Sequence, residues 1–260
     1  MTAATTSRQE HEVTAIPPDL GASSRERLCL ALDLADRKEI LGLVDELKDL
    51  IGYFKVNSAF TLHGPELVRE ILDHGVKVFM DLKLHDIPNT LAGYGHAVTS
   101  LGAHIVTLHT GGGLEMMRAA VVAADRTAAE LGVERPKLVG VTLLTSVDRR
   151  TLNSDLNVQG QVEDEVRRRA LLAAEAGLDG IVCAPSEIEL VKPGLPDDFF
   201  YITPGTRSPG DSGNDHKRIG THADALAGGS SLLVLGRRIH RAKDHRQAAL
   251  EVLREIEAVA

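Results

Sequence analysis

No apolar run in the 260-residue sequence approaches the roughly 20 residues that are needed to cross a bilayer. This absence excludes an integral membrane protein. Positive charge is also scarce, because 29 Lys and Arg stand against 37 Asp and Glu and give a formal net charge of −8. The chain therefore has no overall basic field that would attract duplex nucleic acid or an anionic membrane. We expect neither among its partners. The net charge does not exclude a local basic site.

Cysteine is rare as well. Cys29 and Cys183 stand singly inside apolar runs, without any Cys-x-x-Cys spacing. We expect both to be buried thiols in a reducing compartment, the cytoplasm, rather than a redox pair or metal ligands. Residues 1–25 lack the apolar core of a secretory signal, and Glu10 and Glu12 argue against a transit peptide. We predict a flexible tail over 1–25, followed by one domain over 26–260.

The common nucleotide-binding and metal-binding motifs are missing too. The first apolar run leads into Asp33 and Leu34 rather than a dinucleotide-binding glycine signature, and no P-loop occurs. No His-Glu-x-x-His spacing is present, and His109 is expected to pack or hydrogen-bond rather than bind zinc. Asp81 and Asp86 could attract a divalent cation, but Lys83 between them already supplies positive charge, so no metal is required.

Eight short apolar runs alternate with helical patterns. The runs are too continuously apolar for half-exposed antiparallel strands and suit a parallel sheet that is buried on both faces. This alternation predicts a single-domain (β/α)8 TIM barrel, with an open doubly wound sheet as the second choice. Capping boxes are expected at Asp36 with Glu39 and at Ser186 with Glu189, and Pro65 should begin a helix. The predicted strands are 28–34, 53–56, 76–82, 104–108, 137–143, 180–183, 200–203 and 232–235; the predicted helices are 37–50, 65–73, 90–101, 115–131, 163–176, 186–191, 221–227 and 244–259.

Charged residues occur where the first three predicted strands end. Asp33 follows the first run, Lys55 lies in the second, and Asp81 and Lys83 share one face of the third, with Asp86 in the loop beyond. Active sites of such barrels lie at this end, and buried charges must be paired with one another or with a ligand. A structural ion-pair network would explain one Asp/Lys pair. Charges that converge from three strands instead favour acid/base chemistry.

A second polar region follows the last two predicted strands, over 203–207, 215–218 and 235–238. Barrels commonly bind a phosphate there with loop amides and a cation. Arg237 is the best candidate partner because its planar guanidinium can bind two oxygens at once. A solvated basic loop is the alternative, and it fits Arg241 and Lys243 better.

Residues 81–90, with the sequence DLKLHDIPNT, resemble the Asp-x-Lys-x-x-Asp signature of the orotidine 5′-phosphate decarboxylase family and its usual Ile-Pro-Asn-Thr continuation. The resemblance implies a (β/α)8 barrel that removes CO2 from orotidine 5′-monophosphate (OMP) to give UMP, the last step of de novo pyrimidine synthesis, with no cofactor or metal. Further matches in the family's order cover nearly everything after residue 27 and lie at 31–33, 54–56, 64–65, 143–146, 177–183, 203–205 and 235–237.

The resemblance also implies roles for the matching residues. Lys83 would protonate C6 of the pyrimidine and Asp81 would face the substrate carboxylate, while Lys55 and Asp86 complete a charged network. Asp86 and Ile87 would reach into the site of a second copy, which implies an obligate homodimer. The implied substrate contacts are Asp33, Lys55 and Thr90 for the ribose hydroxyls, Thr145 or Ser146 for the pyrimidine edge, and Arg207, Gly236 and Arg237 for the 5′-phosphate.

Four positions depart from the family's usual residues. His216 replaces a glutamine whose amide bridges phosphate and pyrimidine, and Asn57 replaces a glycine, while His222 and Arg238 stand where proline is common. A neutral His216 can still donate one hydrogen bond, and a protonated one would favour phosphate more strongly. Substrate affinity could therefore be altered or depend on pH, and the sequence does not exclude a different substrate.

Two alternative functions stay open at this point. One is a Mg²⁺-dependent decarboxylase or aldolase of the same barrel superfamily that acts on a sugar phosphate. The other is a barrel that binds UMP without turning over a substrate, which the intact set of Asp81, Lys83 and Asp86 argues against.

Overall fold

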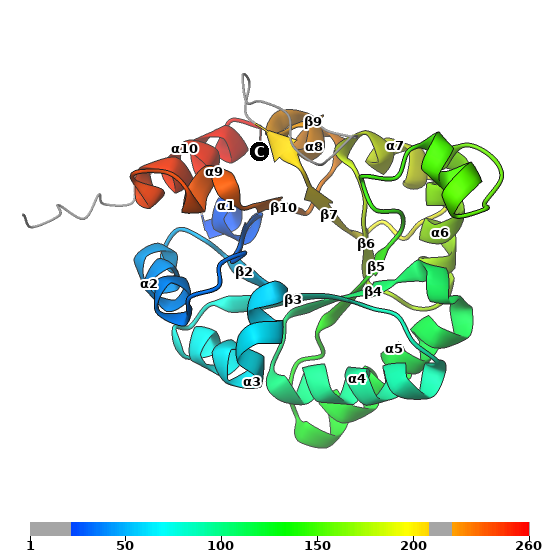
Figure 1. Ribbon diagram of the computed structural model, residues 1–260, viewed down its shortest axis with the longest axis horizontal. Coiled ribbons are helices and arrows are strands. Elements are labelled where there is room, and N and C mark those ends of the chain that lie inside the picture. Colours follow the sequence, from blue (N-terminus) through cyan, green and yellow to red (C-terminus); the bar gives the residue numbers. More distant parts are fainter. Residues whose placement is uncertain (1–21, 208–219, 260) are drawn as a thin grey trace, which may run out of the picture.

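Eight parallel strands close into a barrel in the computed structural model, which describes residues 22–207 and 220–259. Neighbouring strands follow the order β1-β10-β7-β6-β5-β4-β3-β2, so the first strand pairs with the last and no edge is left open (Figure 1). The predicted TIM barrel is thereby confirmed and the open sheet is excluded. The strands are β1 Leu28–Ala31, β2 Tyr53–Val56, β3 Lys77–Leu84, β4 Ile105–His109, β5 Lys137–Val141, β6 Gly180–Val182, β7 Phe200–Pro204 and β10 Leu232–Leu235.

Helices surround the barrel and cover its outer face (Figure 1). Each predicted helical pattern corresponds to a helix of the structure, although the ends differ. The principal helices are α2 Arg37–Leu47, α3 Ser58–Asp73, α4 Pro88–Leu101, α5 Leu114–Leu131, α6 Val162–Glu175, α7 Ile188–Val191, α8 His222–Gly228 and α10 His245–Glu257, with short helices α1 Ala22–Glu26 and α9 Arg237–His240. None of the helices within 22–207 and 220–259 has the length and apolarity that crossing a bilayer requires.

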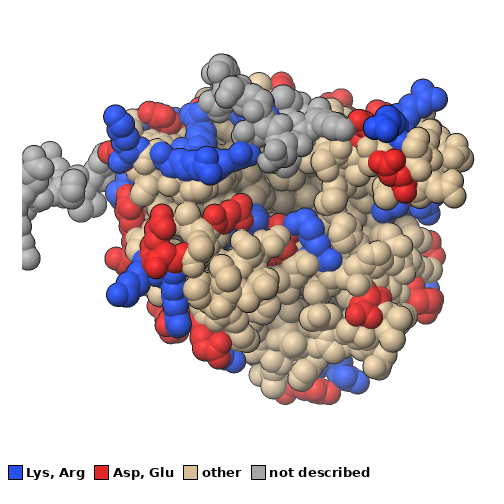
Figure 2. Space-filling view, in the orientation of Figure 1, with Lys and Arg blue, Asp and Glu red and all other residues tan. Residues whose placement is uncertain are grey.

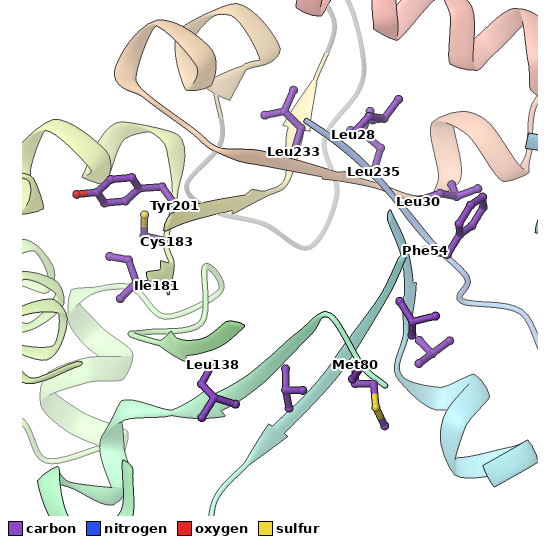
Figure 3. Close-up of a cluster of buried hydrophobic side chains, with 14 of the residues drawn as sticks. Leu28, Leu30, Phe54, Met80, Leu138, Ile181, Cys183, Tyr201, Leu233 and Leu235 are labelled. Carbon is purple, nitrogen blue, oxygen red and sulfur yellow. The ribbon is translucent and has the colours of Figure 1, made fainter. Parts of the chain in front are cut away.

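The core has two parts, one outside the barrel wall and one inside it. The larger part packs the outward side chains of the strands against the helices, and Figure 3 shows some of its members. The smaller part includes Cys29, Phe79 and Ile202, and two of these, Phe79 and Ile202, also line the cavity described below. Both cysteines are buried and free, as predicted, with Cys183 in the larger part. The apolar runs are strands because both of their faces are covered.

Local signals at helix starts were only partly predictive. The side chain of Asp36 accepts a hydrogen bond from the Glu39 N–H and caps α2, which confirms the cap but not the reciprocal bond from the Glu39 side chain that the predicted capping box requires. The predicted capping box of Ser186 with Glu189 is wrong, because Glu187 accepts the N–H of Ala184 instead and a 3-10 turn, Pro185–Glu187, precedes α7.

Helix α3 begins at Ser58, earlier than the predicted start at Pro65. Gly64 interrupts it with a φ of +67°, in the left-handed region that favours glycine, and Pro65 opens its second part. Pro65 therefore does begin a helical segment, as predicted. The earlier start at Ser58 was missed because Asn57, which precedes it, makes no side-chain capping hydrogen bond.

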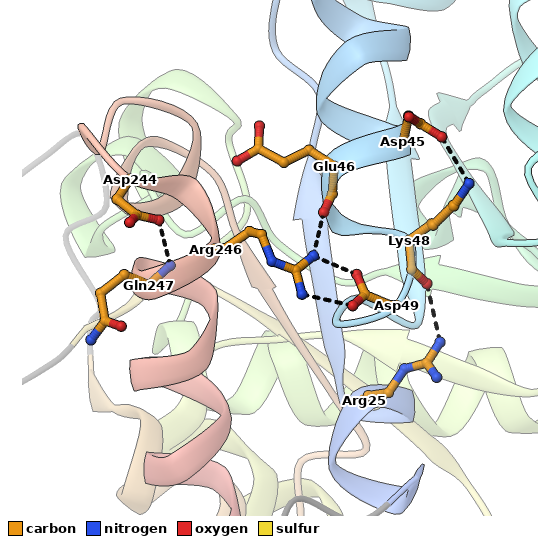
Figure 4. Close-up of polar contacts among 8 residues, drawn as sticks. All are labelled: Arg25, Asp45, Glu46, Lys48, Asp49, Asp244, Arg246 and Gln247. Atoms are coloured by element: carbon orange, nitrogen blue, oxygen red, sulfur yellow. Dashed lines mark hydrogen bonds and ion pairs between the residues drawn. The ribbon is translucent and has the colours of Figure 1, made fainter. Parts of the chain in front are cut away.

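The two ends of the described chain are tied together where the barrel closes. Arg246 of α10 forms a two-pronged ion pair with Asp49, with both N···O distances at 2.7 Å, and also donates to the carbonyl of Glu46 (Figure 4). Arg25 of α1 donates to the carbonyl of Lys48 at 3.1 Å. These contacts join the first and last helices to the loop after α2, and thereby support the seam between β1 and β10.

Candidate active site

A cavity of about 800 Å³ opens at the carboxyl ends of the barrel strands. In the space-filling view this face is hollowed near its centre, with acidic and basic side chains around the hollow (Figure 2). Apolar residues such as Phe79, Val141 and Ile202 form part of its lining. The predicted site residues that line it are Asp33, Lys55, Asp81, Lys83, Thr145, Ser146, Arg207, Gly236 and Arg237.

Four of these residues form a row of alternating charge across three strands. Nζ of Lys55 lies 3.6 Å from Oδ1 of Asp33 and 3.3 Å from Oδ2 of Asp81. Nζ of Lys83 lies 2.7 Å from the same Oδ2. The order is therefore Asp33, Lys55, Asp81, Lys83, and one carboxylate oxygen of Asp81 serves both lysines. This juxtaposition is the one that the strand-end charges predicted.

The two central groups of this row, Asp81 and Lys55, are held ionised by their neighbours. Burial alone would raise the pKa of Asp81, but the ammonium groups of Lys55 and Lys83 and hydrogen bonds from Lys83 and Thr107 hold that pKa below its usual value. Burial likewise acts to lower the pKa of Lys55, but the carboxylates of Asp81 and Asp33 outweigh it and raise that pKa. The side chain of Lys55 is only 9% exposed, so these charges interact with little screening by water.

Two residues that the sequence analysis did not assign to the site secure Asp81 from both sides. The hydroxyl of Thr107, on β4, donates to Oδ1 of Asp81 at 2.9 Å. Asn57, after β2, donates from Nδ2 to the backbone carbonyl of Asp81 at 2.9 Å. Asn57 had been singled out only as a departure from glycine. Thr107 gave no signal, because a threonine in an apolar strand is an ordinary strand residue.

The opposite end of the cavity is basic. Arg207, on the short strand β8 Thr206–Arg207, and Arg237, at the start of α9, both line it. Nη2 of Arg207 and Oγ1 of Thr206 are buried and have no hydrogen-bond partner within the described residues. Buried polar groups are rarely left unsatisfied, so these two atoms fit a site for a ligand with acceptor oxygens. His216 lies outside the described residues.

Three predicted site residues lie in the loop and helix start beyond β3, away from the cavity of this chain. Oδ1 of Asp86 accepts the N–H of Ile87 at 2.7 Å, and the carbonyl of Ile87 accepts the N–H of Thr90 at 3.0 Å. Ile87 is 65% exposed. None of the three lines the cavity, so a single chain does not bring Asp86, Ile87 or Thr90 to the charged row.

The other departures from the family's pattern lie beside the basic end. Arg238 lines the cavity, and its Nη2 lies 3.3 Å from Oε1 of Glu255 and 3.8 Å from Oε2 of Glu251 on α10. His222, at the start of α8, is buried, with Nε2 at 3.9 Å from Oε2 of Glu255. Arg238 therefore connects the cavity wall to α10, and His222 lies close to the same helix.

The histidine at the end of β4 packs as expected. The rings of His109 and His85 lie 5.6 Å apart at a tilt of 44°. Burial, together with the nearby His85 and Lys83, lowers the pKa of His109. Among the residues that the structure describes, no cluster of three His, Cys, Asp or Glu side chains is arranged to hold a metal ion.

Comparisons with known proteins agree with this geometry. Residues 26–252 match the model of the Orotidine 5′-phosphate decarboxylase / HUMPS family. The chain is 42% identical over 237 residues to an orotidine 5′-phosphate decarboxylase of Moorella thermoacetica, covering 91% of this chain and 94% of the relative. It is 40% identical over 236 residues to the enzyme of the same name from Syntrophomonas wolfei, covering 90% and 99%.

A solved structure is similar over nearly the same range. The crystal structure of orotidine 5′-phosphate decarboxylase from Lactobacillus acidophilus superposes with a TM-score of 0.78 at 32% identity, covering 89% of this chain and 99% of that one. Sequence, fold and the charged row at the strand ends thus point the same way, and the chain belongs to the Orotidine 5′-phosphate decarboxylase / HUMPS family.

Proposed function

We infer that the chain is a carboxy-lyase that converts orotidine 5′-phosphate to UMP and CO2, a step of pyrimidine biosynthesis. Family membership and the two relatives at 40% identity or more support the reaction. The single observation that assigns the reaction to this cavity is the row of Asp33, Lys55, Asp81 and Lys83. The row places an ammonium group beside a carboxylate at the carboxyl ends of the strands.

Lys83 is the proposed proton donor. When the bond between C6 and the carboxylate carbon breaks, CO2 leaves and the electron pair stays on C6. The ammonium of Lys83 stabilises that developing negative charge and then transfers its proton to C6, which gives UMP, and the amine recovers a proton from water. The interaction strengthens as charge builds up on C6, so it lowers the barrier rather than only binding the substrate.

Asp81 is proposed to face the substrate carboxylate. Two carboxylates held close repel each other, and this repulsion is relieved when CO2 departs. Lys55 pairs with both Asp33 and Asp81, which holds the two carboxylates in place and keeps that of Asp81 ionised. Asp33 and Lys55 are further proposed to contact the ribose hydroxyls, together with Thr90, which does not line the cavity of its own chain and would come from a second copy.

The basic end of the cavity is proposed to bind the 5′-phosphate through Arg207, Gly236 and Arg237. Nη2 of Arg207 is buried and has no hydrogen-bond partner in the part of the chain that the structure describes, and this supports the assignment because a phosphate oxygen would satisfy it. Thr145 or Ser146 is proposed to bind the pyrimidine edge, and His216 to stand in for the amide that relatives use between pyrimidine and phosphate. Binding of the remote phosphate can organise the charged row around the reacting carbon.

We propose that the working enzyme is a homodimer. Within residues 22–207 and 220–259 of its own chain, Lys83 pairs with one carboxylate, and the exposed positions of Asp86 and Ile87 suit delivery to a neighbouring site. Asp86 of a second copy would then complete the row beside Lys83. The proposed compartment is the cytoplasm, since Cys29 and Cys183 are both free thiols.

Loss of orotidylate absorbance on addition of the purified protein, with and without EDTA, tests the proposed reaction and its independence from metal ions. We expect turnover to UMP at the same rate in both samples. Orotidylate turnover that stops with EDTA and returns with Mg²⁺ would contradict a reaction without metal. No orotidylate turnover, together with Mg²⁺-dependent turnover of a sugar phosphate, would instead indicate the sugar-phosphate branch of the superfamily. Binding of UMP with no turnover of orotidylate would leave a nucleotide-binding barrel.

A further inference from the structure

The ladder between β3 and β4 is interrupted at the charged row. Met80 pairs with Val106, and the next pair is Leu84 with Leu108. Three residues of β3, at positions 81–83, therefore lie opposite a single residue of β4, Thr107. Such a bulge leaves backbone groups of the longer strand without their ladder partners and re-aims the side chains that it carries.

Thr107 supplies the missing contacts with its side chain. Its Oγ1 accepts the backbone N–H of Lys83 at 3.0 Å and donates to Oδ1 of Asp81 at 2.9 Å. The residue is fully buried, with 0% of its surface exposed. One hydroxyl therefore links the backbone of the proposed proton donor to the carboxylate beside it, in a place where water cannot substitute for it.

The backbone at Lys83 needs this support. Its φ is +50°, in the left-handed region that residues other than glycine seldom adopt, at a cost that neighbouring contacts must offset. The hydrogen bond from the Lys83 N–H to Thr107 lies directly at the strained residue. Loss of the acceptor would leave a buried N–H unsatisfied and remove a contact that holds this conformation.

The same hydroxyl fixes which oxygen of Asp81 meets the lysines. Because Oδ1 is engaged by Thr107, Oδ2 is directed to Nζ of Lys55 and Nζ of Lys83, at 3.3 and 2.7 Å. Without the hydroxyl, the carboxylate is free to rotate and to share its oxygens differently between the two ammonium groups. The direction in which the Lys83 ammonium points would change with it.

We propose that Thr107 is a positioning residue for the decarboxylation: its hydroxyl holds the bulge of β3 so that Asp81 and Lys83 are set together against C6 of the substrate. This inference rests on the proposed function. Thr107 does not line the cavity, so its effect should fall on the chemical step rather than on substrate binding.

Three variants test the proposal: Thr107→Val removes the hydroxyl at nearly constant shape, Thr107→Ser keeps it, and Thr110→Val is the matched control. Thr110 is also buried, and its Oγ1 donates to the carbonyl of Val141 at 2.9 Å, away from Asp81 and Lys83. We expect Thr107→Val to lower kcat about 10- to 100-fold, with KM and UMP affinity changed less than about threefold. Thr107→Ser and Thr110→Val should keep most of the wild-type kcat.

Each outcome separates the positioning role from the reaction itself. Wild-type protein without orotidylate turnover would overturn the proposed function. Active wild type, with Thr107→Val equally active, would overturn only the role of Thr107. An equal loss of kcat in Thr110→Val would reduce that role to general packing. If Thr107→Val does not fold, Thr107→Ser and Thr107→Ala decide: a folded serine variant as impaired as the alanine variant contradicts a role for the hydroxyl.

Discussion

The ammonium group of Lys83 lies 2.7 Å from Oδ2 of Asp81, two positions earlier on the same strand, while the backbone of Lys83 is in the left-handed region. The pairing brings the proposed proton donor against a buried carboxylate that Lys55 also contacts at 3.3 Å. The proposed chemistry depends on the relationship between these groups. Five predictions follow from it and from the contacts that support the barrel around it.

The pH dependence of stability should reveal the ionised state of Asp81. Its pKa is lowered from the ordinary 3.8, so its carboxylate stabilises the fold above that value, and the contribution is lost as the pH falls through the folded-state pKa. Asp81→Asn leaves two buried ammonium groups undercompensated and should lower the free energy of unfolding by about 3 kcal/mol at pH 7.

Urea denaturation of both proteins at a series of pH values measures this difference. It should be as large at pH 5 as at pH 7 and shrink only below pH 3.8, because the wild-type carboxylate is protonated only there. A difference that has already vanished at pH 5 would mean that Asp81 is not held ionised by the lysines.

Substrate binding should depend on the basic end of the cavity. Arg237→Ala removes a guanidinium that lines it and should raise KM for orotidylate about 30- to 150-fold, since hydrogen bonds to charged groups are strong and Arg can bind two phosphate oxygens. Arg241→Ala is the matched control, because Arg241 is exposed and does not line the cavity. Steady-state kinetics on both variants checks the assignment, and equal effects would point to a diffuse basic surface instead of a phosphate site.

Mixing two inactive variants tests the proposed dimer. If Asp86 acts in the site of the other copy, Lys83→Ala and Asp86→Ala each lose activity, but a hybrid dimer contains one site with both residues intact. Random exchange of subunits should then restore about a quarter of the wild-type activity, since half of the dimers are hybrids with one intact site each. A mixture as inactive as its components would place Asp86 outside the partner's site.

The seam of the barrel should be a stability determinant with no part in the chemistry. Arg246→Ala breaks the two-pronged contact with Asp49. Because the Arg246 side chain is only 13% exposed, the change should lower the free energy of unfolding in urea by about 1–2 kcal/mol and leave kcat unchanged. Lys48→Ala breaks the ion pair between Lys48 and Asp45, whose side chains are both exposed, and should lower the free energy of unfolding much less than Arg246→Ala does. Equal costs would mean that Arg246 contributes only as a surface charge.

The sequence predicted those parts of the site in which a charged residue stands in or directly after an apolar strand. Burying an unpaired charge in an apolar strand costs free energy, so the sequence alone predicted that Lys55 and Asp81 are paired. Parallel strands align their carboxyl ends, which brought Arg207 and Arg237 to the same cavity. The barrel itself followed from eight apolar runs alternating with helical patterns.

The remaining features depend on geometry that no local pattern encodes. Lys83 has a positive φ although it is not a glycine, so its residue type gives no sign of this conformation. The bulge that places Thr107 opposite positions 81–83 exists only once the two strands pair. Asn57 acts through a backbone carbonyl, which every residue has. The capping box predicted at Ser186 failed because Glu187 competes for the same turn and accepts the N–H of Ala184.

The most direct test of the account is the turnover of Lys83→Ala measured beside its affinity for UMP. We predict that loss of orotidylate absorbance falls to the background rate, because no other ammonium is assigned to C6, while UMP still binds within about threefold of wild type through the phosphate end of the cavity. Near-normal turnover by this variant would contradict the role of Lys83 and with it the mechanism.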